Sequence, residues 1–325
     1  TNSANYTLDI GRHCVLSAGT TLTANASSIL VDENWTNNGA TFTAGTSTVT
    51  FDNDAVNGTL GGTSSTTFYN LVVNDTANTV TLGIATNVAG AFTCTAGTFS
   101  TSGTNYAMDI DGAVTINGAT VQFNGSAVTV GGSWTFSSGT FTAGTSTVTF
   151  DGATTPVTVS GASNTTFNNF TVNKSDNTKI VSIANTSSVT TTSLLTQGIL
   201  DIQGATFTAG TYDYDQTGTE VRFTLGATQS IQAVTYYNLR INKTAGFTAS
   251  LTAATSVLND FTATLGTFST SATNYAFNVD GDVLINGGTV QCNASAVTVA
   301  SDWTFSAGTF TAGTSTVTFD GGVAQ

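Results

Sequence analysis

A twelve-residue stretch that recurs unchanged constrains the fold more than any other feature of this sequence. The stretch TFTAGTSTVTFD occupies residues 41–52, 140–151 and 309–320, and its opening TFTAG returns at 206–210. In the first copy, Val49 and Phe51 alternate with threonines, so an extended strand places hydroxyls on one face and apolar side chains on the other. A strand this short cannot bury its apolar face alone. Near-verbatim copies along a chain are typical of stacked repeats that cover each other's faces.

Weaker echoes of the same pattern set the structural period. They are spaced by 22 and 20 residues in two parts of the chain, at Thr98, Thr120 and Thr140 and again at Thr267, Thr289 and Thr309. A period of about 21 residues suits one coil of a parallel β-helix, which predicts an all-β solenoid of about 15 coils. The alternative is an array of β-sandwich domains, because the first two copies are separated by 99 residues, from Thr41 to Thr140, which is about the length of one such domain.

The repeats run from one end of the chain to the other, so we expect a single continuous body over residues 1–325. Its sequence blocks are 1–40, 41–139, 140–205, 206–308 and 309–325. The hydrophobic content of 39% is sufficient for a core, and 8% charged residues argues against disorder. The six basic residues are scattered singly in a chain of net charge −13. We therefore expect no nucleic-acid partner. No apolar run is long enough to predict membrane insertion.

Side chains on the apolar face of each copy are predicted to form the structural core. They are Phe42, Val49 and Phe51, Phe141, Val148 and Phe150, and Phe310, Val317 and Phe319. The cysteines Cys14, Cys94 and Cys292 align with apolar residues of other copies, namely Val114, Ala263 and Phe123. We expect all three to be buried free thiols, since no CxxC spacing is present.

No catalytic constellation or cofactor site is predicted. His13 is the only histidine, so neither a Ser-His-Asp triad nor a histidine metal site can be assembled, and we expect no enzyme. Paired acids such as Asp109 with Asp111 are interpreted as turn residues at strand ends.

The stretch TYDYDQTG interrupts the fourth TFTAG strand. The strand then resumes as TEVRF, with Glu220 and Arg222 standing where Thr48 and Thr50 stand in the first copy. We expect the insertion to form a loop on one face of the solenoid, where function is carried. We interpret the insertion as a decorated turn. The alternative is a calcium or sugar site beside Tyr212 and Tyr214, for which Asp213 and Asp215 are the candidate metal ligands.

Several Asn-x-(Ser/Thr) sequons mark candidate glycosylation sites, among them Asn34, Asn74, Asn124, Asn164 and Asn293. In a chain rich in Asn, Thr and Ser, many sequons arise by chance.

The repeats resemble the Thr-, Gly- and Asn-rich β-solenoid arrays of large secreted bacterial surface proteins, including adhesins and extracellular filament proteins. The resemblance covers the whole chain through strands such as TFTAGTSTVTFDG. It implies an extracellular or cell-surface structural role without catalysis. The alternatives are an adhesin, an ice- or carbohydrate-binding module, in which surface glycans are the partners, and a polysaccharide-active enzyme.

The sequence begins and ends in the middle of the pattern, with no atypical capping repeat. We therefore expect self-association into a filament or longer rod, because open strand edges pair with other chains.

Overall fold

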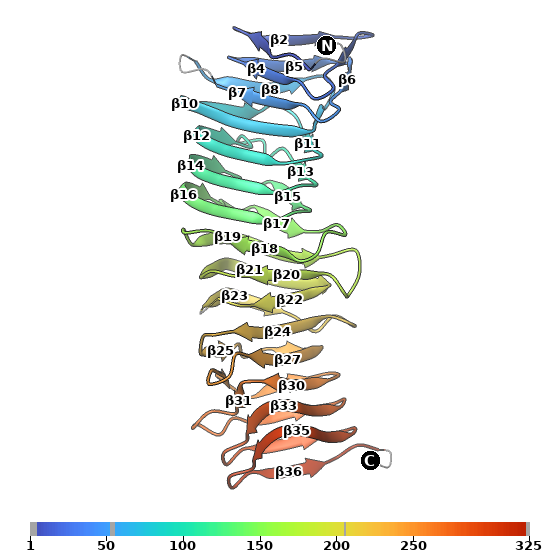
Figure 1. Cartoon of the computed structure of the whole chain (residues 1–325), viewed down its shortest axis with the longest axis vertical. Helices are drawn as coiled ribbons and strands as arrows, with labels where there is room; N and C mark the ends of the chain where they lie inside the picture. The colour runs from blue at the N-terminus through green and yellow to red at the C-terminus, as the bar shows by residue number, and fades with distance from the viewer. Residues whose placement is uncertain (1–4, 53–55, 205, 323–325) are drawn as a thin grey trace. The chain divides into compact units, whose positions relative to one another are not determined.

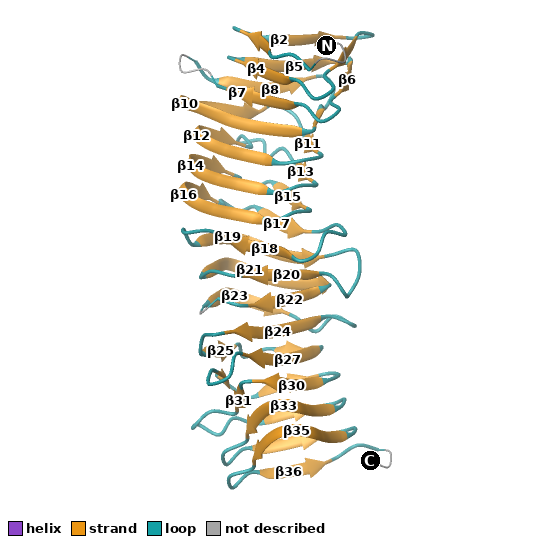
Figure 2. Ribbon diagram, in the orientation of Figure 1, coloured by secondary structure: helices purple, strands orange, loops and turns teal. Residues whose placement is uncertain are grey.

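The computed structural model describes residues 5–52, 56–204 and 206–322. Within these ranges the chain is all-β with no helix, and parallel strands stack into a β-solenoid of about 15 turns. Figure 2 shows strands joined by short loops throughout both compact units, Thr1–Phe170 and Thr171–Gln325. The β-helix prediction is confirmed, and the sandwich alternative is wrong because the strand pairs are parallel. The expectation of one continuous body stays a prediction.

Unit 1 is built from coils with three sides, each side being a ladder of parallel strands (Figure 1). The first side contains β1 (Leu8–Ile10), β4 (Ser28–Val31), β7 (Thr48–Phe51) and the first parts of β10 (Asn70–Leu82), β12 (Phe92–Ser100), β14 (Val114–Gln122) and β16 (Trp134–Thr142). The last of these pairs with β18 (Val157–Ser160). The second side contains β2 (Cys14–Ser17), β5 (Asn34–Asn38), β8 (Gly58–Gly62) and the second parts of β10, β12, β14 and β16. The third contains β3 (Thr21–Thr23) with β6 (Thr41–Thr43), and β9 (Thr67–Phe68), β11 (Thr86–Val88), β13 (Met108–Ile110), β15 (Ala127–Val130) and β17 (Thr147–Phe150).

Unit 2 repeats this architecture, and β19 (Thr165–Asn173) contains the boundary between the units. Its first side contains β20 (Ile180–Ile183), β22 (Ile199–Ile202), β24 (Glu220–Leu225), β27 (Asn238–Lys243), β30 (Phe261–Leu265) and the first parts of β33 (Val283–Gln291) and β35 (Trp303–Thr311). The second contains β25 (Gln229–Ile231), β28 (Thr248–Leu251), β31 (Thr267–Ser269) and the second parts of β33 and β35. The third contains β21 (Ser187–Gln197) with β23 (Phe207–Asp213), and β26 (Thr235–Tyr236), β29 (Thr255–Val257), β32 (Phe277–Val279), β34 (Ala296–Val299) and β36 (Thr316–Phe319).

Strand partners in neighbouring coils are about one predicted period apart. Phe92 pairs with Val114, and Val114 pairs with Trp134, which are separations of 22 and 20 residues. A glycine fixes one corner of the coil, because Gly45 has φ of +60° and a Cβ there would lie 2.3 Å from the backbone oxygen of Asn25. Only glycine fits such a close approach at positive φ without strain. The invariant Ala-Gly-Thr of the recurrent stretch therefore turns the chain at this corner.

Identical sequences occupy different sides of the solenoid in unit 1. In the first copy, Val49 pairs with Leu71, and the same ladder continues through Phe92 to Trp134. In the second copy, the equivalent Val148 pairs with Val128 on the third side instead. The 99 residues from Thr41 to Thr140 are not a whole number of coils of about 21 residues, so the second copy lies one side over.

The predicted core is largely found where we expected it. Val49, Phe51, Val148 and Phe150 are at most 1% exposed. Phe42, Phe141 and Phe310 are half-buried, each with its ring edge-on to a tryptophan of the same coil.

The prediction is wrong for Phe319, which is 54% exposed, and Val317 is only half-buried. Their strand, β36, pairs on one side with β34, and no described coil follows to cover the other side.

The three cysteines are buried free thiols, as expected. Burial raises the pKa of Cys14 and Cys292 to about 11 and raises that of Cys94 well above its ordinary value. A protonated, buried thiol is unreactive, so each cysteine acts as an apolar filler of the core.

Candidate functional site in the irregular coils of unit 2

The third side of unit 2 is interrupted where the TYDYDQTG insertion enters. The ladder of β21 and β23 is joined to β26 by one isolated bridge, between Tyr214 and Tyr236, among the residues the structure describes. Both tyrosines lie in the core, at 1% and 0% exposure. The hydroxyl of Tyr214 is 2.7 Å from Ser193 Oγ, and the hydroxyl of Tyr236 donates to the Gln232 carbonyl at 3.0 Å. At this point the two coils are therefore joined by one backbone bridge and by the packing of two buried aromatic rings, in place of a continuous strand pair.

The insertion forms an exposed loop only in its second part, and its first part continues the strand into the core. Tyr214 has no exposed ring face on which a sugar could stack, and Tyr212 is half-buried, with its hydroxyl accepting a hydrogen bond from the Ala209 amide at 2.8 Å. The insertion alternates like a strand until Tyr214, and the turn follows at Asp215–Gly218. Burial of Tyr214 and partial burial of Tyr212 outweigh the polar character of Asp213 between them.

The two candidate metal ligands lie close together at this turn. Asp213 is half-buried and Asp215 is exposed. Burial, followed by repulsion from Asp215, raises the pKa of Asp213 above its ordinary value. Within the described ranges, no group of three or more His, Cys, Asp or Glu side chains is placed to hold a metal ion. The pair offers at most two carboxylates, and the calcium site stays a prediction.

The predicted alignment of TEVRF with the first copy is confirmed by strand register. Glu220 pairs with Asn238, just as Thr48 pairs with the equivalent Asn70. Arg222 in turn pairs with Arg240 on the neighbouring coil. Basic residues that are far apart in the sequence therefore lie side by side, which corrects our description of them as singly scattered.

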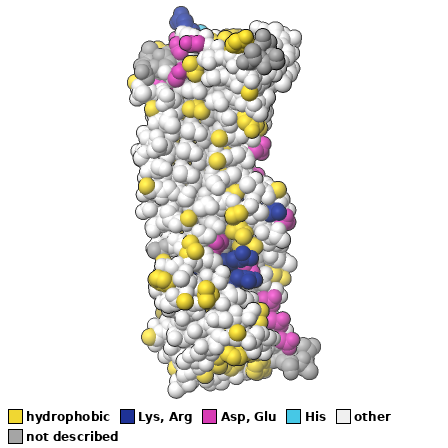
Figure 3. Space-filling model, viewed as in Figure 1, with side chains coloured by type: hydrophobic (Ala, Val, Ile, Leu, Met, Phe, Trp, Pro, Cys, Tyr) yellow, Lys and Arg dark blue, Asp and Glu magenta, His cyan; other side chains and the backbone are white. Residues whose placement is uncertain are grey.

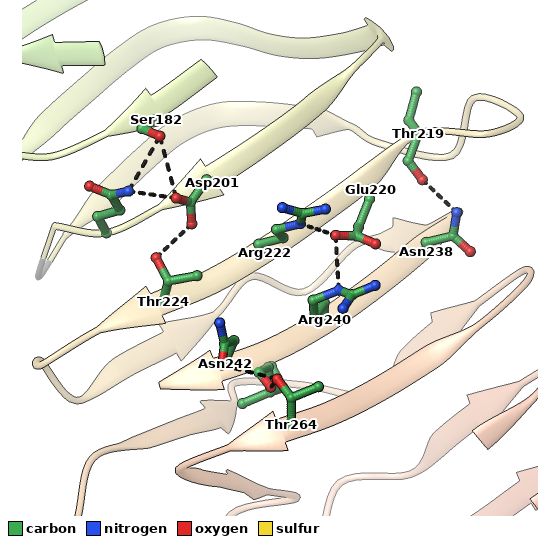
Figure 4. Close-up of polar contacts among 12 residues, drawn as sticks. Ser182, Asp201, Thr219, Glu220, Arg222, Thr224, Asn238, Arg240, Asn242 and Thr264 are labelled. Carbon is green, nitrogen blue, oxygen red and sulfur yellow. Dashed lines mark hydrogen bonds and ion pairs between the residues drawn. The ribbon is translucent and has the colours of Figure 1, made fainter. Parts of the chain in front are cut away.

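Glu220 bridges these two arginines (Figure 4). Its Oε1 atom contacts Nε of Arg222 and lies 3.1 Å from Nε of Arg240. The glutamate side chain is 15% exposed and the two arginines are 26% and 36% exposed. Figure 3 shows such a cluster of basic and acidic side chains on a surface that is otherwise mostly uncharged. The second guanidinium leaves one positive charge that Glu220 does not neutralise.

Asp201 supplies a second carboxylate on the same ladder, where it pairs with Arg222. Its Oδ1 accepts a hydrogen bond from Thr224 at 2.7 Å, and its Oδ2 accepts from Gln203 at 2.6 Å and Ser182 at 3.3 Å. Asp201 is held by these hydroxyl and amide donors, and its charge acts on Lys243. The Glu220 cluster with the two arginines lies on the outer face of the coils, with guanidinium edges exposed to solvent.

Lys243 is a buried cation that the sequence analysis missed. Its side chain is inaccessible to solvent, and Nζ donates at 2.5 Å both to the Thr224 carbonyl and to Gln229 Oε1. Burial lowers the pKa of Lys243 to about 8. The signal was present in the sequence, because the recurrent segments ending at Asp75, Lys174 and Lys243 each close on a charged residue, and all three are at most 1% exposed.

Two hollows flank the interrupted side. One has a volume of about 300 Å³ and lies among Phe207, Phe223, Gln229 and Ser230. The other has a volume of about 480 Å³ and lies among Tyr212, Gln232 and Ala233. Hydroxyl, amide and aromatic groups dominate both linings, which suits hydrogen bonding to a neutral polar ligand more than proton transfer.

Other predicted residues have structural partners. His13 Nε2 lies 3.1 Å from Glu33 Oε2 and its Nδ1 lies 3.1 Å from Asn34 Nδ2.

The sequon residues Asn124 and Asn293 adopt positive φ at a coil corner, and their side-chain amides donate to the preceding coil. Asn74 and Asn164 are exposed sequons.

Threonines form straight rows on the outside of both units. In unit 1 consecutive coils contribute Thr79, Thr98, Thr120 and Thr140; in unit 2 they contribute Thr248, Thr267, Thr289 and Thr309. The sequence echoes at 98–140 and 267–309 were recognised as a period, but their alignment into rows follows from the coil register.

The last described coil of unit 2 has an exposed apolar face. Phe305 is 51% exposed, whereas its equivalent Phe136 in unit 1 is 6% exposed. A shallow hollow of about 440 Å³ lies among Asp302, Trp303, Thr304 and Phe319.

Comparison with known proteins identifies no relative: no family model, curated protein or solved structure matches this chain. None of the described segments is a helix long and apolar enough to cross a membrane.

Proposed function

We propose that this chain is an extracellular structural protein, a subunit of a cell-surface fibre that grows by stacking coil upon coil. The observation that carries the proposal is the exposure of inward-facing residues in the outermost described coils. Leu8 is 36% exposed in the first, whereas the equivalent Met108 is 1% exposed. Phe319 is 54% exposed in the last, whereas the equivalent Phe150 is fully buried. A further coil would bury both.

The open coils also present backbone edges. The strands β1 and β36 each pair on one side, with β4 and β34, within the described ladders. An unpaired strand edge combined with an apolar face is a template for addition of another strand. Contact between two different faces repeats head to tail, and it generates a filament when the rotation between subunits does not close a ring.

The composition and the resemblance support the extracellular setting. The surface relies on Thr, Ser and Asn more than on charge, with 8% charged residues, as in the secreted solenoid arrays that the repeats resemble. N-linked glycans would be attached to this chain at the exposed Asn74 and Asn164. The side-chain amides of Asn124 and Asn293 are instead hydrogen-bonded within the fold. Intact-mass analysis of native material tests these two positions.

Light scattering and negative-stain microscopy across a concentration series test the fibre. We expect concentration-dependent rods or bundles of rods, and Phe319→Asp should suppress them because it places a charge on the open face. Phe247→Asp is the matched control, since Phe247 is exposed on a turn away from the first and last coils. Dispersed monomers at high concentration, with the first and last coils protected from hydrogen exchange, would contradict the proposal.

The threonine rows favour one second candidate, an ice-binding module. Rows of hydroxyls on consecutive coils, spaced by the strand separation of about 4.8 Å, form a regular array in each unit. A thermal-hysteresis assay tests this directly. Thr120→Lys in the middle of the unit 1 row should abolish any activity of that row, whereas Thr149→Lys on another side should not.

A further inference from the structure

The exposed face of the last described coil contains one half of a packing arrangement that is complete at two places in unit 1. Its central feature is a tryptophan–phenylalanine pair, Trp303 and Phe310, with ring centroids 5.1 Å apart and planes at 75°. Unit 1 contains the same pair at 4.9 Å and 71–72°, formed by Trp35 with Phe42 and by Trp134 with Phe141. The uncovered pair of Trp303 and Phe310 therefore already has the ring geometry of the covered pairs.

In unit 1 a phenylalanine of the next coil covers each pair. Phe68 lies 5.2 Å from Trp35 and 6.0 Å from Phe42. In the second copy the distances are nearly the same, since Phe167 lies 5.3 Å from Trp134 and 5.9 Å from Phe141.

A threonine two residues before that phenylalanine receives the indole N–H. Trp35 Nε1 donates to Thr66 Oγ1 at 3.1 Å, and Trp134 Nε1 donates to Thr165 Oγ1 at 3.2 Å. Both tryptophans and both threonines are buried. A buried indole N–H requires such an acceptor, so the threonine is part of the recognition.

The covering segment has the same length and plan in both copies. It begins with a strand laid on the tryptophan strand, where Leu60 pairs with Trp35 and Val159 pairs with Trp134. It ends eleven residues later, at Leu71 in the first copy and Phe170 in the second. The backbone N–H of the preceding asparagine donates to the backbone carbonyl of Ser47 in the first copy and of Ser146 in the second, at 3.0 Å in both. Residues 58–71 and 157–170 are the two examples.

We propose that the open face around Trp303 binds an extended segment of this chemistry: a short β-strand followed by Thr-Thr-Phe-x-Asn and a large apolar residue. The inference rests on the proposed addition of a further coil to this face and names the segment that forms that coil. The hollow among Trp303, Thr304 and Phe319 receives the phenylalanine ring, and the threonine hydroxyl accepts the Trp303 N–H. Main-chain pairing to the open edge of the coil supplies the rest of the affinity.

A synthetic peptide of residues 57–75 tests the proposal by titration into the full chain. Trp35 and Trp134 are at most 1% exposed, so a change in tryptophan emission reports on Trp303. We expect a saturable blue shift that is lost in Trp303→Phe, and at least tenfold weaker binding when the peptide carries Phe68→Ala. Phe247→Ser in the protein should leave binding unchanged. No saturable shift, or equal binding of a scrambled peptide, would overturn the proposal.

A fused chain provides the second test, because it does not depend on peptide solubility. Residues 154–173 are placed directly after residue 322, where the register of the second copy would put them, and the effective concentration of the segment becomes high. Acrylamide quenching of Trp303 should fall toward that of the buried tryptophans. A matched fusion with Phe167→Ser and Thr165→Val in the added segment should leave Trp303 as accessible as in the parent chain.

The outcomes separate this inference from the proposed fibre. Fibres that form although neither the peptide nor the fused segment protects Trp303 would overturn the inference and leave the fibre standing. Protection of Trp303 in a chain that stays monomeric at every concentration would support the inference and contradict the fibre.

Discussion

Truncation of two phenylalanines with identical local sequences measures how much coil stacking contributes to the free energy of unfolding. Phe150 and Phe319 occupy the same position of TFTAGTSTVTFD, so strand propensity and turn chemistry are the same at both. Phe150 is fully buried, with its ring 5.4 Å from Phe170 of the next coil. Phe319 is 54% exposed. The difference between the two substitutions therefore isolates the covering coil.

The expected magnitudes follow from burial. Phe150→Ala should cost about 3 to 5 kcal/mol, since it removes a fully buried ring and leaves a cavity. Phe319→Ala should cost about 1 kcal/mol, because less than half of that ring is removed from water and no closed cavity forms. Thr149→Ala should cost under about 0.5 kcal/mol, since the Thr149 side chain is on the outer face.

Hydrogen exchange read by mass spectrometry gives a free energy of opening for each coil, which avoids assuming that the whole chain unfolds in one step. The peptides of interest contain β15 and β17 for Phe150, and β34 and β36 for Phe319. Equal losses at Phe150 and Phe319 would refute the role of the covering coil. Equal losses at Phe150 and Thr149 would refute the assignment of inner and outer faces.

Three further predictions concern buried and partly buried charges and thiols. The pKa of Lys243 is lowered to about 8, so the unfolded chain binds more protons than the folded one above that value. Melting temperature relative to a Lys243→Met control should therefore rise between pH 7.5 and 9, and a flat difference would contradict the burial. Cys94 should not react with a thiol reagent in the folded chain, because burial keeps its thiol protonated, and rapid labelling would contradict this burial. A reducing agent should leave the melting temperature unchanged, and a large drop in melting temperature would contradict the assignment of free thiols. Glu220→Gln should destabilise the coils of β24 and β27 by about 1 to 3 kcal/mol, as expected for loss of a charge-assisted contact that holds two arginines; exchange unchanged in these strands would contradict it.

The regular parts of the fold were predictable because the same pattern of apolar, polar and turn residues recurs in successive coils. Alternation in TSTVTF assigns inner and outer faces, and the spacing of the Thr echoes matches the coil period, as the pairing of Thr98 with Thr120 confirms. The alignment of Glu220 with Thr48 was likewise recoverable, since an insertion leaves the flanking strand pattern intact.

The irregular parts were not predictable, because they depend on neighbours that are distant along the chain. The contact of Glu220 with Arg240 requires the register of the following coil, which the alternation of one strand does not specify. Tyr214 was assigned to a loop because insertions in a solenoid form loops, yet its ring lies in the core where the ladder is interrupted. Phe319 was assigned to the core from its own strand alone, whereas burial also requires the coil that follows.

The shift of identical stretches from one side of unit 1 to another bears on how such a chain can lengthen. If the block from Thr41 to Thr140 is the unit that duplicates, each duplication adds a fraction of a turn as well as whole turns. The hydroxyls displayed by one copy then point in a different direction from those of the next. Copying the block therefore places a surface feature on more than one side of the solenoid, and a partner can meet it from more than one direction.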